Sequence, residues 1–170
     1  ADSQRELGTR YLDGHVDVNQ DFSLAVKWFE DAAAQENAMA HYHLGRMHAN
    51  GQGVTQNSRR AEELFRQAAA QGEANIQHRV GNVFADGVGG IQENAVEAAT
   101  WYYQAAVQGY IDAQFKLGEM YRDGEGVRED FWYSYVWFSI VASQSSAVRD
   151  QAVRLRNYMA DKLTPEELGD

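Results

Sequence analysis

The chain has 170 residues, of which 44% are hydrophobic, so it can bury a core of its own and a disordered chain is excluded. Its formal net charge of −10 at pH 7 disfavours nucleic acid as a partner, because proteins that bind nucleic acid cluster Lys and Arg against the phosphates. The absence of cysteine excludes disulfides and thiolate metal sites, and no apolar run approaches the roughly 20 residues that span a bilayer.

Helix-forming residues dominate the composition. The chain contains one proline, and Ala, Glu, Gln and Arg are abundant. These residues favour helix over strand, so the sequence predicts an all-α fold.

Two glycines recur along the chain at a fixed phase. Four Leu-Gly or Val-Gly pairs follow one another at steps of 37, 36 and 37 residues, and their glycines are Gly8, Gly45, Gly81 and Gly118. A further glycine stands six residues after each of them. This period is typical of stacked helical hairpins. We expect one domain over residues 1–170, with four repeats at about 1–37, 38–73, 74–110 and 111–145.

Each repeat is predicted to hold a first helix, a glycine-bearing loop, a second helix and a tight turn. The residues expected to cap the second helices are Asp21, Asn57, Asn94 and Asp130. The turn carries a glycine at Gly72 and Gly109, and in the first repeat Asn37 is expected to take the left-handed conformation instead. Glycine costs about 1 kcal/mol relative to alanine inside a helix, so the glycine of each first helix predicts a closely crossing neighbour.

The segment after the repeats predicts a terminal cap. Residues 146–163 place apolar side chains at helical spacing, which suits a capping helix that covers the last repeat. Thr164, Pro165 and Glu167 then form the signature of the start of a short further helix.

The segments ANIQHRVGNVFADGVGG and IDAQFKLGEMYRDGEGVRED resemble the Sel-one-like repeat (SLR), and the resemblance covers residues 1 to about 145. It implies a fold class of all-α, an α-α superhelix (a right-handed solenoid) related to tetratricopeptide repeats. Members of that family serve as adaptors or scaffolds, often in bacterial envelopes or at host contacts. The resemblance implies no shared chemistry.

No reacting group of residues emerges from the sequence. The loops NGQGV and DGVGGI lack the spacing and the preceding strand of a phosphate-binding loop. His41 and His48 would lie about 10 Å apart on one helix, too far to share a metal ion. Serine nucleophile motifs are missing as well. We therefore predict no enzyme, and no catalytic, cofactor-binding or metal-binding residue.

Large aromatic residues recur in the second helices. They are Trp28, Phe29, Phe65, Trp101, Trp137 and Phe138. Their recurrence at one phase predicts that they form the core between helices and not a stacking platform for a ligand.

The resemblance to tetratricopeptide-like solenoids implies that the first helices line a concave face. By phase from the Leu-Gly pairs, the residues expected to bind a partner there are Arg5, Tyr42, Arg46, Asn50, Asn75, His78, Asn82, Phe115, Glu119 and Arg122. Aromatic side chains among polar ones are typical of protein interfaces.

We therefore expect a non-catalytic scaffold that binds a peptide or protein partner, with a periplasmic or secreted bacterial location favoured over the cytoplasm. Two alternatives stay open at this point. One is a self-assembling piece of a longer repeat protein, because the chain opens on Ala1 and its first repeat has no cap of its own. The other is a module that binds envelope polysaccharide.

Overall fold

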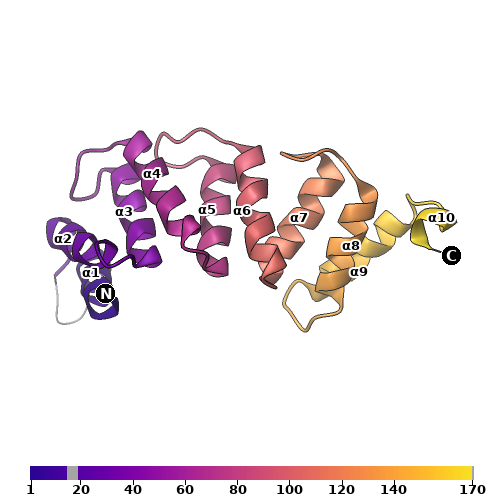
Figure 1. The fold of residues 1–170 in the computed structure, drawn as a ribbon, viewed down its shortest axis with the longest axis horizontal. Coiled ribbons are helices and arrows are strands. Elements are labelled where there is room, and N and C mark those ends of the chain that lie inside the picture. Colours follow the sequence, from indigo (N-terminus) through magenta and orange to yellow (C-terminus); the bar gives the residue numbers. More distant parts are fainter. Residues whose placement is uncertain (15–18, 170) are drawn as a thin grey trace. The chain divides into compact units, whose positions relative to one another are not determined.

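The computed structural model describes residues 1–14 and 19–169. Every regular element within them is an α-helix, which confirms the predicted all-α class (Figure 1). The helices are α1 (Asp2–Asp13), α2 (Phe22–Ala33), α3 (Ala38–Asn50), α4 (Ser58–Ala70), α5 (Ala74–Asp86), α6 (Ala95–Val107), α7 (Ile111–Asp123), α8 (Phe131–Ala142), α9 (Arg149–Ala160) and α10 (Pro165–Leu168).

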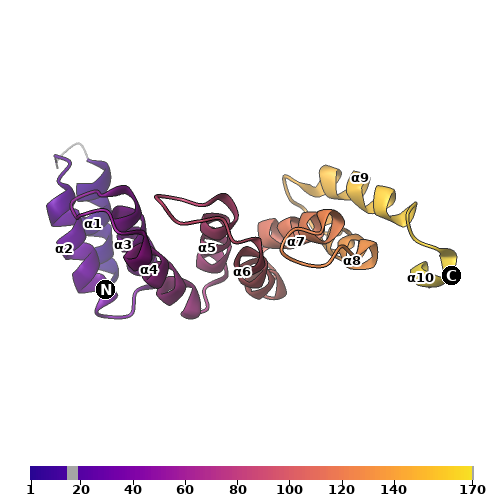
Figure 2. The same ribbon diagram turned by 90° about the horizontal axis from the view of Figure 1, so that it is seen from above.

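The helices divide into two compact units, Ala1–Glu93 with α1 to α5 and Asn94–Asp170 with α6 to α10. In the first unit each helix packs on the next along the chain, and α3 also contacts α5 (Figure 2). In the second unit α6, α7, α8 and α9 pack in the same successive way. Each unit is thus a stack of helical hairpins. The prediction of one domain over residues 1–170 stays a prediction.

The predicted capping residues begin the second helices. A side-chain oxygen of each accepts a hydrogen bond from the backbone N–H three residues later, which supplies one of the partners that the first turn of a helix lacks. These bonds are Asp21 to Leu24 (3.0 Å), Asn57 to Arg60 (3.0 Å), Asn94 to Glu97 (3.1 Å) and Asp130 to Tyr133 (3.0 Å). The four predicted caps are confirmed.

The turn between α2 and α3 differs from the prediction. Asn37 has φ −77° and caps α3 by accepting a hydrogen bond from the N–H of Ala40 at 2.9 Å. Glu36 takes the left-handed conformation, with φ 58°. It stands where the corresponding turns have Gly72 and Gly109. The left-handed role predicted for Asn37 is therefore wrong, because its amide is used as a cap.

The glycines of the first helices lie against aromatic rings of the second helices. A Cβ atom built on Gly8 would stand 2.8 Å from the ring of Phe29, one on Gly45 2.8 Å from Phe65, and one on Gly118 2.7 Å from Phe138. Carbon atoms do not pack that closely, so only glycine leaves room for the ring. The predicted close crossing of helices is confirmed at these three glycines.

The rings that face these glycines belong to three of the recurring aromatic residues of the second helices. Phe29, Phe65 and Phe138 are fully buried. Trp28, Trp101 and Trp137 are only partly buried. Consecutive residues of a helix point about 100° apart, so one member of each pair faces the glycine and the other lies at the rim of the core. The predicted core therefore needs correction for the three tryptophans.

The predicted capping helix is α9. It packs on α8 and buries Ala152 and Met159 in one hydrophobic cluster with Phe138 and Val141. After it, Thr164 and Glu167 form the predicted capping box at the start of α10, where the N–H of Thr164 donates to the Glu167 carboxylate at 2.8 Å. The apolar side of the last hairpin is thus covered.

Candidate interaction surface

The predicted partner-binding residues all lie on first helices of the repeats. In the first unit Arg5 lies on α1, three of them on α3 and three on α5; in the second unit Phe115, Glu119 and Arg122 lie on α7. Arg46, Asn50 and Asn75 are exposed, whereas Arg5, Tyr42, His78 and Asn82 are partly buried.

Tyr42 lies between Phe65 and His43 in a row of rings in the first unit. Its ring centroid lies 5.4 Å from that of Phe65 and 6.0 Å from that of His43. His43 in turn stacks on the buried Phe29 at 4.7 Å, with the planes only 10° apart. On the other side the guanidinium of Arg79 lies 5.8 Å from the centroid of Tyr42. Tyr42 thus links the core to the surface of α3.

His43 occupies an unusual electrostatic position beside Tyr42. Burial lowers its pKa to about 4, and the charges of Arg46, Arg5 and Arg79 contribute in the same direction. Its buried Nδ1 has no hydrogen-bond partner among the described residues. The ring is therefore neutral at pH 7, and three arginines from three helices act on it.

We call Arg5, Arg46 and Arg79 the arginine cluster. Within the described parts of the chain, Arg46 and Arg79 form no ion pair, and Arg5 has only a long contact of 3.9 Å with Asp2, whose side chain is 87% exposed. Arg5 and Arg46 are among the residues predicted from the sequence to bind a partner, whereas Arg79 and His43 are not. Both of these stand two residues before a first-helix glycine, so a repeat alignment at that position could have found them.

The amide and imidazole side chains predicted on α5 are already engaged within the chain. Asn75 accepts a hydrogen bond from the N–H of Ile76 at 2.9 Å, and His78 and Asn82 also have partners. Asn50 is exposed at the last position of α3.

Phe115 does not belong to the surface of the second unit. It is 7% exposed, and its ring centroid lies 5.4 Å from that of Phe138. It packs in one hydrophobic cluster with side chains of α8 and α9, including Met159. The prediction of an accessible aromatic anchor at this position is wrong, because α8 and α9 cover it.

The charged residues predicted on α7 are paired with neighbours. Glu119 forms an ion pair of 3.2 Å with Lys116. Arg122 holds both carboxylate oxygens of Asp123, at 2.7 and 2.5 Å. These hydrogen bonds raise the pKa of Arg122 and lower that of Asp123. The charges of this face are thus largely balanced by one another.

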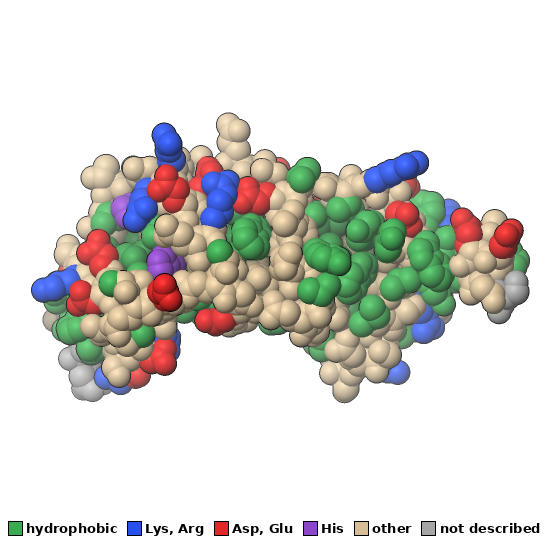
Figure 3. Space-filling view, viewed as in Figure 1, with side chains coloured by type: hydrophobic (Ala, Val, Ile, Leu, Met, Phe, Trp, Pro, Cys, Tyr) green, Lys and Arg blue, Asp and Glu red, His purple; other side chains and the backbone are tan. Residues whose placement is uncertain are grey.

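A second surface feature lies in the second unit, and no sequence pattern indicated it. Tyr103, Tyr121 and several smaller residues of α6, of α7 and of the loop after α7 line a hollow of about 260 Å³. Tyr133 stacks on Tyr121 at 5.1 Å, and both Tyr103 and Tyr133 are exposed. Burial, followed by the nearby Tyr133, Tyr103 and Asp130, raises the pKa of Tyr121. Figure 3 shows hydrophobic side chains gathered over α7 and α8 on the face that it draws.

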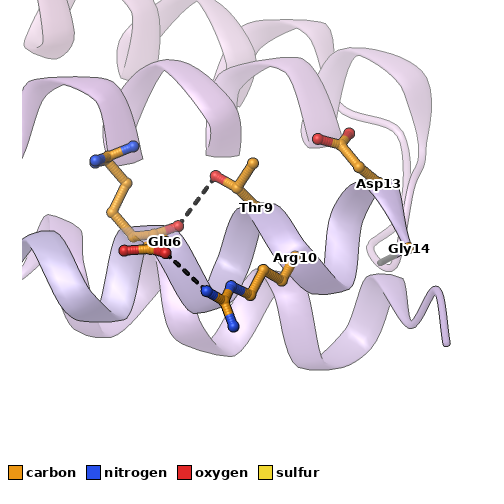
Figure 4. Close-up of a pocket in the computed structure, with 6 residues that line it drawn as sticks. Glu6, Thr9, Arg10, Asp13 and Gly14 are labelled. Carbon is orange, nitrogen blue, oxygen red and sulfur yellow. Dashed lines mark hydrogen bonds and ion pairs between the residues drawn. The ribbon is translucent and has the colours of Figure 1, made fainter. Parts of the chain in front are cut away.

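A hollow of about 270 Å³ runs along α1 (Figure 4). The groups that line it bond within their own helix: Arg10 pairs with Glu6 at 3.0 Å, and the Thr9 hydroxyl donates to the carbonyl of Arg5 at 3.1 Å.

Among the described residues no group of three or more His, Asp or Glu side chains is placed to hold a metal ion. Nor does this part of the chain contain a helix with the length and apolar character needed to cross a membrane.

Comparison with known proteins gives three results. The model of the Sel1 repeat family matches residues 1–37, 38–73, 76–110 and 111–146. The structure is similar to that of a protective antigen with an SLR fold that is present in uropathogenic Escherichia coli strains, with 31% identity and a TM-score of 0.72 over 99% of this chain. It is also similar to a Sel1 repeat protein from Oxalobacter formigenes, with 25% identity and a TM-score of 0.72 over 96% of this chain. The chain spans 35% of the length of the first protein and 74% of the second. No curated protein matches the chain.

Proposed function

We propose that this chain, which belongs to the Sel1 repeat family and has the α-α superhelix fold of helical hairpins, is a scaffold. It binds a protein or peptide on the accessible side of its first helices. Proteins with this repeat generally mediate protein–protein interactions and are typically non-catalytic. The similar structure of a protective antigen from uropathogenic Escherichia coli strains favours a bacterial protein at a host contact.

The observation that carries this proposal is the accessible row of side chains on α3 of the first unit. Tyr42 offers a partly buried ring, and the exposed Arg46 and Asn50 stand on the same helix. Tyrosine and arginine are enriched at the energetic centres of protein interfaces, because each combines apolar contact with hydrogen bonding. The exposed side of α7 is a weaker candidate for a binding face, since Phe115 is buried and the charged residues Glu119 and Arg122 are paired with neighbours.

Partner capture by single variants of the first unit tests the proposal. Tyr42→Ala is expected to reduce capture of the native partner from an extract at least about tenfold, the loss typical of a central aromatic residue. Because Tyr42 also packs on Phe65, the exposed Asn50→Ala serves as a second variant that leaves the core intact. Circular dichroism and thermal melts establish that both variants fold.

Tyr158→Ala is the matched control, because Tyr158 is an exposed tyrosine on α9 of the second unit. Its capture should equal that of the unmodified chain. Undiminished capture by both Tyr42→Ala and Asn50→Ala would show that the partner binds elsewhere and would refute this face.

A second candidate function, binding of an envelope polysaccharide, is favoured by the tyrosine-lined hollow of the second unit. Its accessible rings and hydroxyls offer apolar faces next to hydrogen-bonding groups. Retention on immobilised cell-wall polysaccharide tests it, and Tyr103→Ala should abolish that retention. Equal retention of Tyr103→Ala and the unmodified chain would exclude the hollow as a glycan site.

A further inference from the structure

The arginine cluster surrounds one pair of rings in the first unit. Arg79 of α5 lies over Tyr42, and Tyr42 lies beside His43 on α3. His43 stacks on Phe29, the ring that fills the space at Gly8, and Arg5 is one helical turn before Gly8 on α1. The charges of all three arginines act on the His43 ring. The charges of three arginines from α1, α3 and α5 thus act on one patch of the first unit, the surface at Tyr42 and His43.

Arg46 and Arg79 differ from the other arginines of the first unit, which all contact a carboxylate of their own helix. Arg10, Arg60 and Arg66 each form an ion pair with a glutamate of their own helix, at 3.0, 3.2 and 3.2 Å. In a chain with a formal net charge of −10, carboxylates are plentiful, yet none of the described ones lies against Arg46 or Arg79. The patch is thus a local excess of positive charge on an acidic protein.

We propose that the arginine cluster binds an acidic segment of the partner protein, with two or more Asp or Glu carboxylates on Arg5, Arg46 and Arg79 and an apolar part of the segment on Tyr42. This inference rests on the function proposed above and names the chemistry of its partner. The planar guanidinium suits a carboxylate because two parallel N–H groups can donate to its two oxygens.

The arrangement favours a peptide over other anions. The arginines stand on three successive first helices, so an extended chain that crosses these helices can bring a carboxylate to each of them, whereas one small anion cannot. A nucleic acid would bring a long row of phosphates to a protein of the same sign of charge, which costs electrostatic energy outside the patch. An acidic segment can confine its charges to the cluster.

Fluorescence anisotropy with a defined probe tests the inference. The probe is a fluorescein-labelled decapeptide that alternates Glu and Ala, and the control peptide carries Gln in place of Glu. We expect saturable binding of the Glu peptide and none of the Gln peptide. The Arg46→Gln/Arg79→Gln variant should bind the Glu peptide at least about tenfold more weakly, since two charge-assisted contacts are lost.

The matched control is Arg59→Gln/Arg60→Gln, which removes the same charge from the surface of α4. It should change the affinity less than about twofold, because only long-range attraction is altered. An equal loss of affinity for the Glu peptide in both double variants would show that only the net charge of the protein matters, and would refute the proposed site. Tighter binding of a labelled single-stranded DNA than of the Glu peptide would overturn the choice of ligand.

The His43 imidazole provides a readout at the site itself. The charges that lower its pKa come from Arg46 on its own helix, Arg5 on α1 and Arg79 on α5. Bound carboxylates would offset these charges, so NMR titration should show a higher pKa of His43 in the peptide-saturated protein. An unchanged His43 titration at saturation would place the peptide elsewhere and overturn the inference.

The outcomes separate this inference from the proposed function. If the native partner is captured and lost with Tyr42→Ala, while the Glu peptide does not bind at millimolar concentration, the acidic-segment inference fails and the proposed function stands. If the variants Tyr42→Ala and Asn50→Ala leave capture intact, the proposed face fails, whatever the peptide does.

Discussion

At the residue scale, the side chains that define the arginine cluster show both the reach and the limit of sequence reasoning. Tyr42 and Arg46 could be selected because the phase of a helix follows from the Leu-Gly pair. The role of His43 could not, since it depends on the Phe29 ring of another helix and on Arg79 of a third. Phe115 has the same phase as Tyr42, yet α8 and α9 cover it. Phase along one helix does not report what packs on it.

The lowered pKa of His43 predicts a pH dependence of stability. In the unfolded chain the imidazole has its ordinary pKa of 6.5, whereas in the folded chain the value is about 4. The unfolded state therefore binds the proton first as the pH falls. The contribution of His43 is complete above pH 6.5 and is lost between pH 6.5 and about 4, to a total of about 3 kcal/mol.

Urea denaturation at a series of pH values measures this loss. The His43→Phe variant keeps a ring stacked on Phe29 but cannot take up a proton, so its stability should fall less between pH 6.5 and 4. Parallel curves for the two proteins would contradict the assignment. The other histidines are common to both chains and cancel in the comparison.

A second prediction at this scale concerns Gly45. Alanine is the better helix former by about 1 kcal/mol, but its Cβ would stand 2.8 Å from the Phe65 ring. We expect Gly45→Ala to lower the free energy of unfolding by about 1–3 kcal/mol, because the ring must shift in a packed core. In a double-mutant cycle, Gly45→Ala should lower the free energy of unfolding less in the Phe65→Leu background than in the unmodified chain. A gain in stability from Gly45→Ala alone would show that the crossing tolerates a methyl group.

At the scale of the elements, the starts of the second helices were predictable because Asp and Asn at these positions cap the backbone directly. The turn at Glu36 and Asn37 was not, because asparagine suits both a cap and a left-handed turn, and only the backbone decides between them. The tryptophans were predicted to be core residues but are only partly buried, for a related reason. Recurrence locates an apolar pair on a helix but does not say which member faces the crossing glycine.

A further link between elements is a buried glutamine that no pattern indicated. Gln114 of α7 donates to the carbonyl of Ala106 in α6 at 3.0 Å and accepts from Gln144, after α8, at 2.9 Å. Gln77 makes the same bond to the carbonyl of Ala69 in the first unit, at 3.3 Å. The side chain thus joins the end of one hairpin to the start of the next.

Gln114→Ala is expected to lower the free energy of unfolding by about 1–3 kcal/mol, because the side-chain hydrogen bonds of Gln114 to Ala106 and Gln144 are both lost. Chemical denaturation measures the change. The exposed Gln151→Ala on α9 serves as the control, and its effect should stay within about 0.5 kcal/mol. Similar values for the two variants would mean that Gln114 contributes little to the junction.

At the scale of the whole molecule, stability is distributed over repeats, because each hairpin mainly contacts its neighbours along the chain. The two units have separate hydrophobic clusters, one around Phe29 and Met47 and one around Phe138 and Met159. The repeat period made the architecture predictable, since it defines hairpins that must stack. The identity of the partner was not, because it depends on exposed side chains that the period does not constrain.

Local coupling predicts an uneven response to damage at the end of the chain. Met159→Ala removes a fully buried side chain of α9 and should cost about 2–4 kcal/mol within its unit. Hydrogen exchange should then accelerate in α7, α8 and α9, while the amides of α1 to α4 keep their protection. A uniform acceleration over both units would contradict this distribution of stability.

The turn at Glu36 leaves room for improvement by design. A side chain with a Cβ atom pays about 1–2 kcal/mol in the left-handed region, and the equivalent turns avoid that penalty with Gly72 and Gly109. Glu36→Gly should therefore raise the melting temperature by a few degrees without touching the surface of the first helices. Such a variant would be a more stable parent protein, in which the affinities of binding variants can be compared without the effects of partial unfolding.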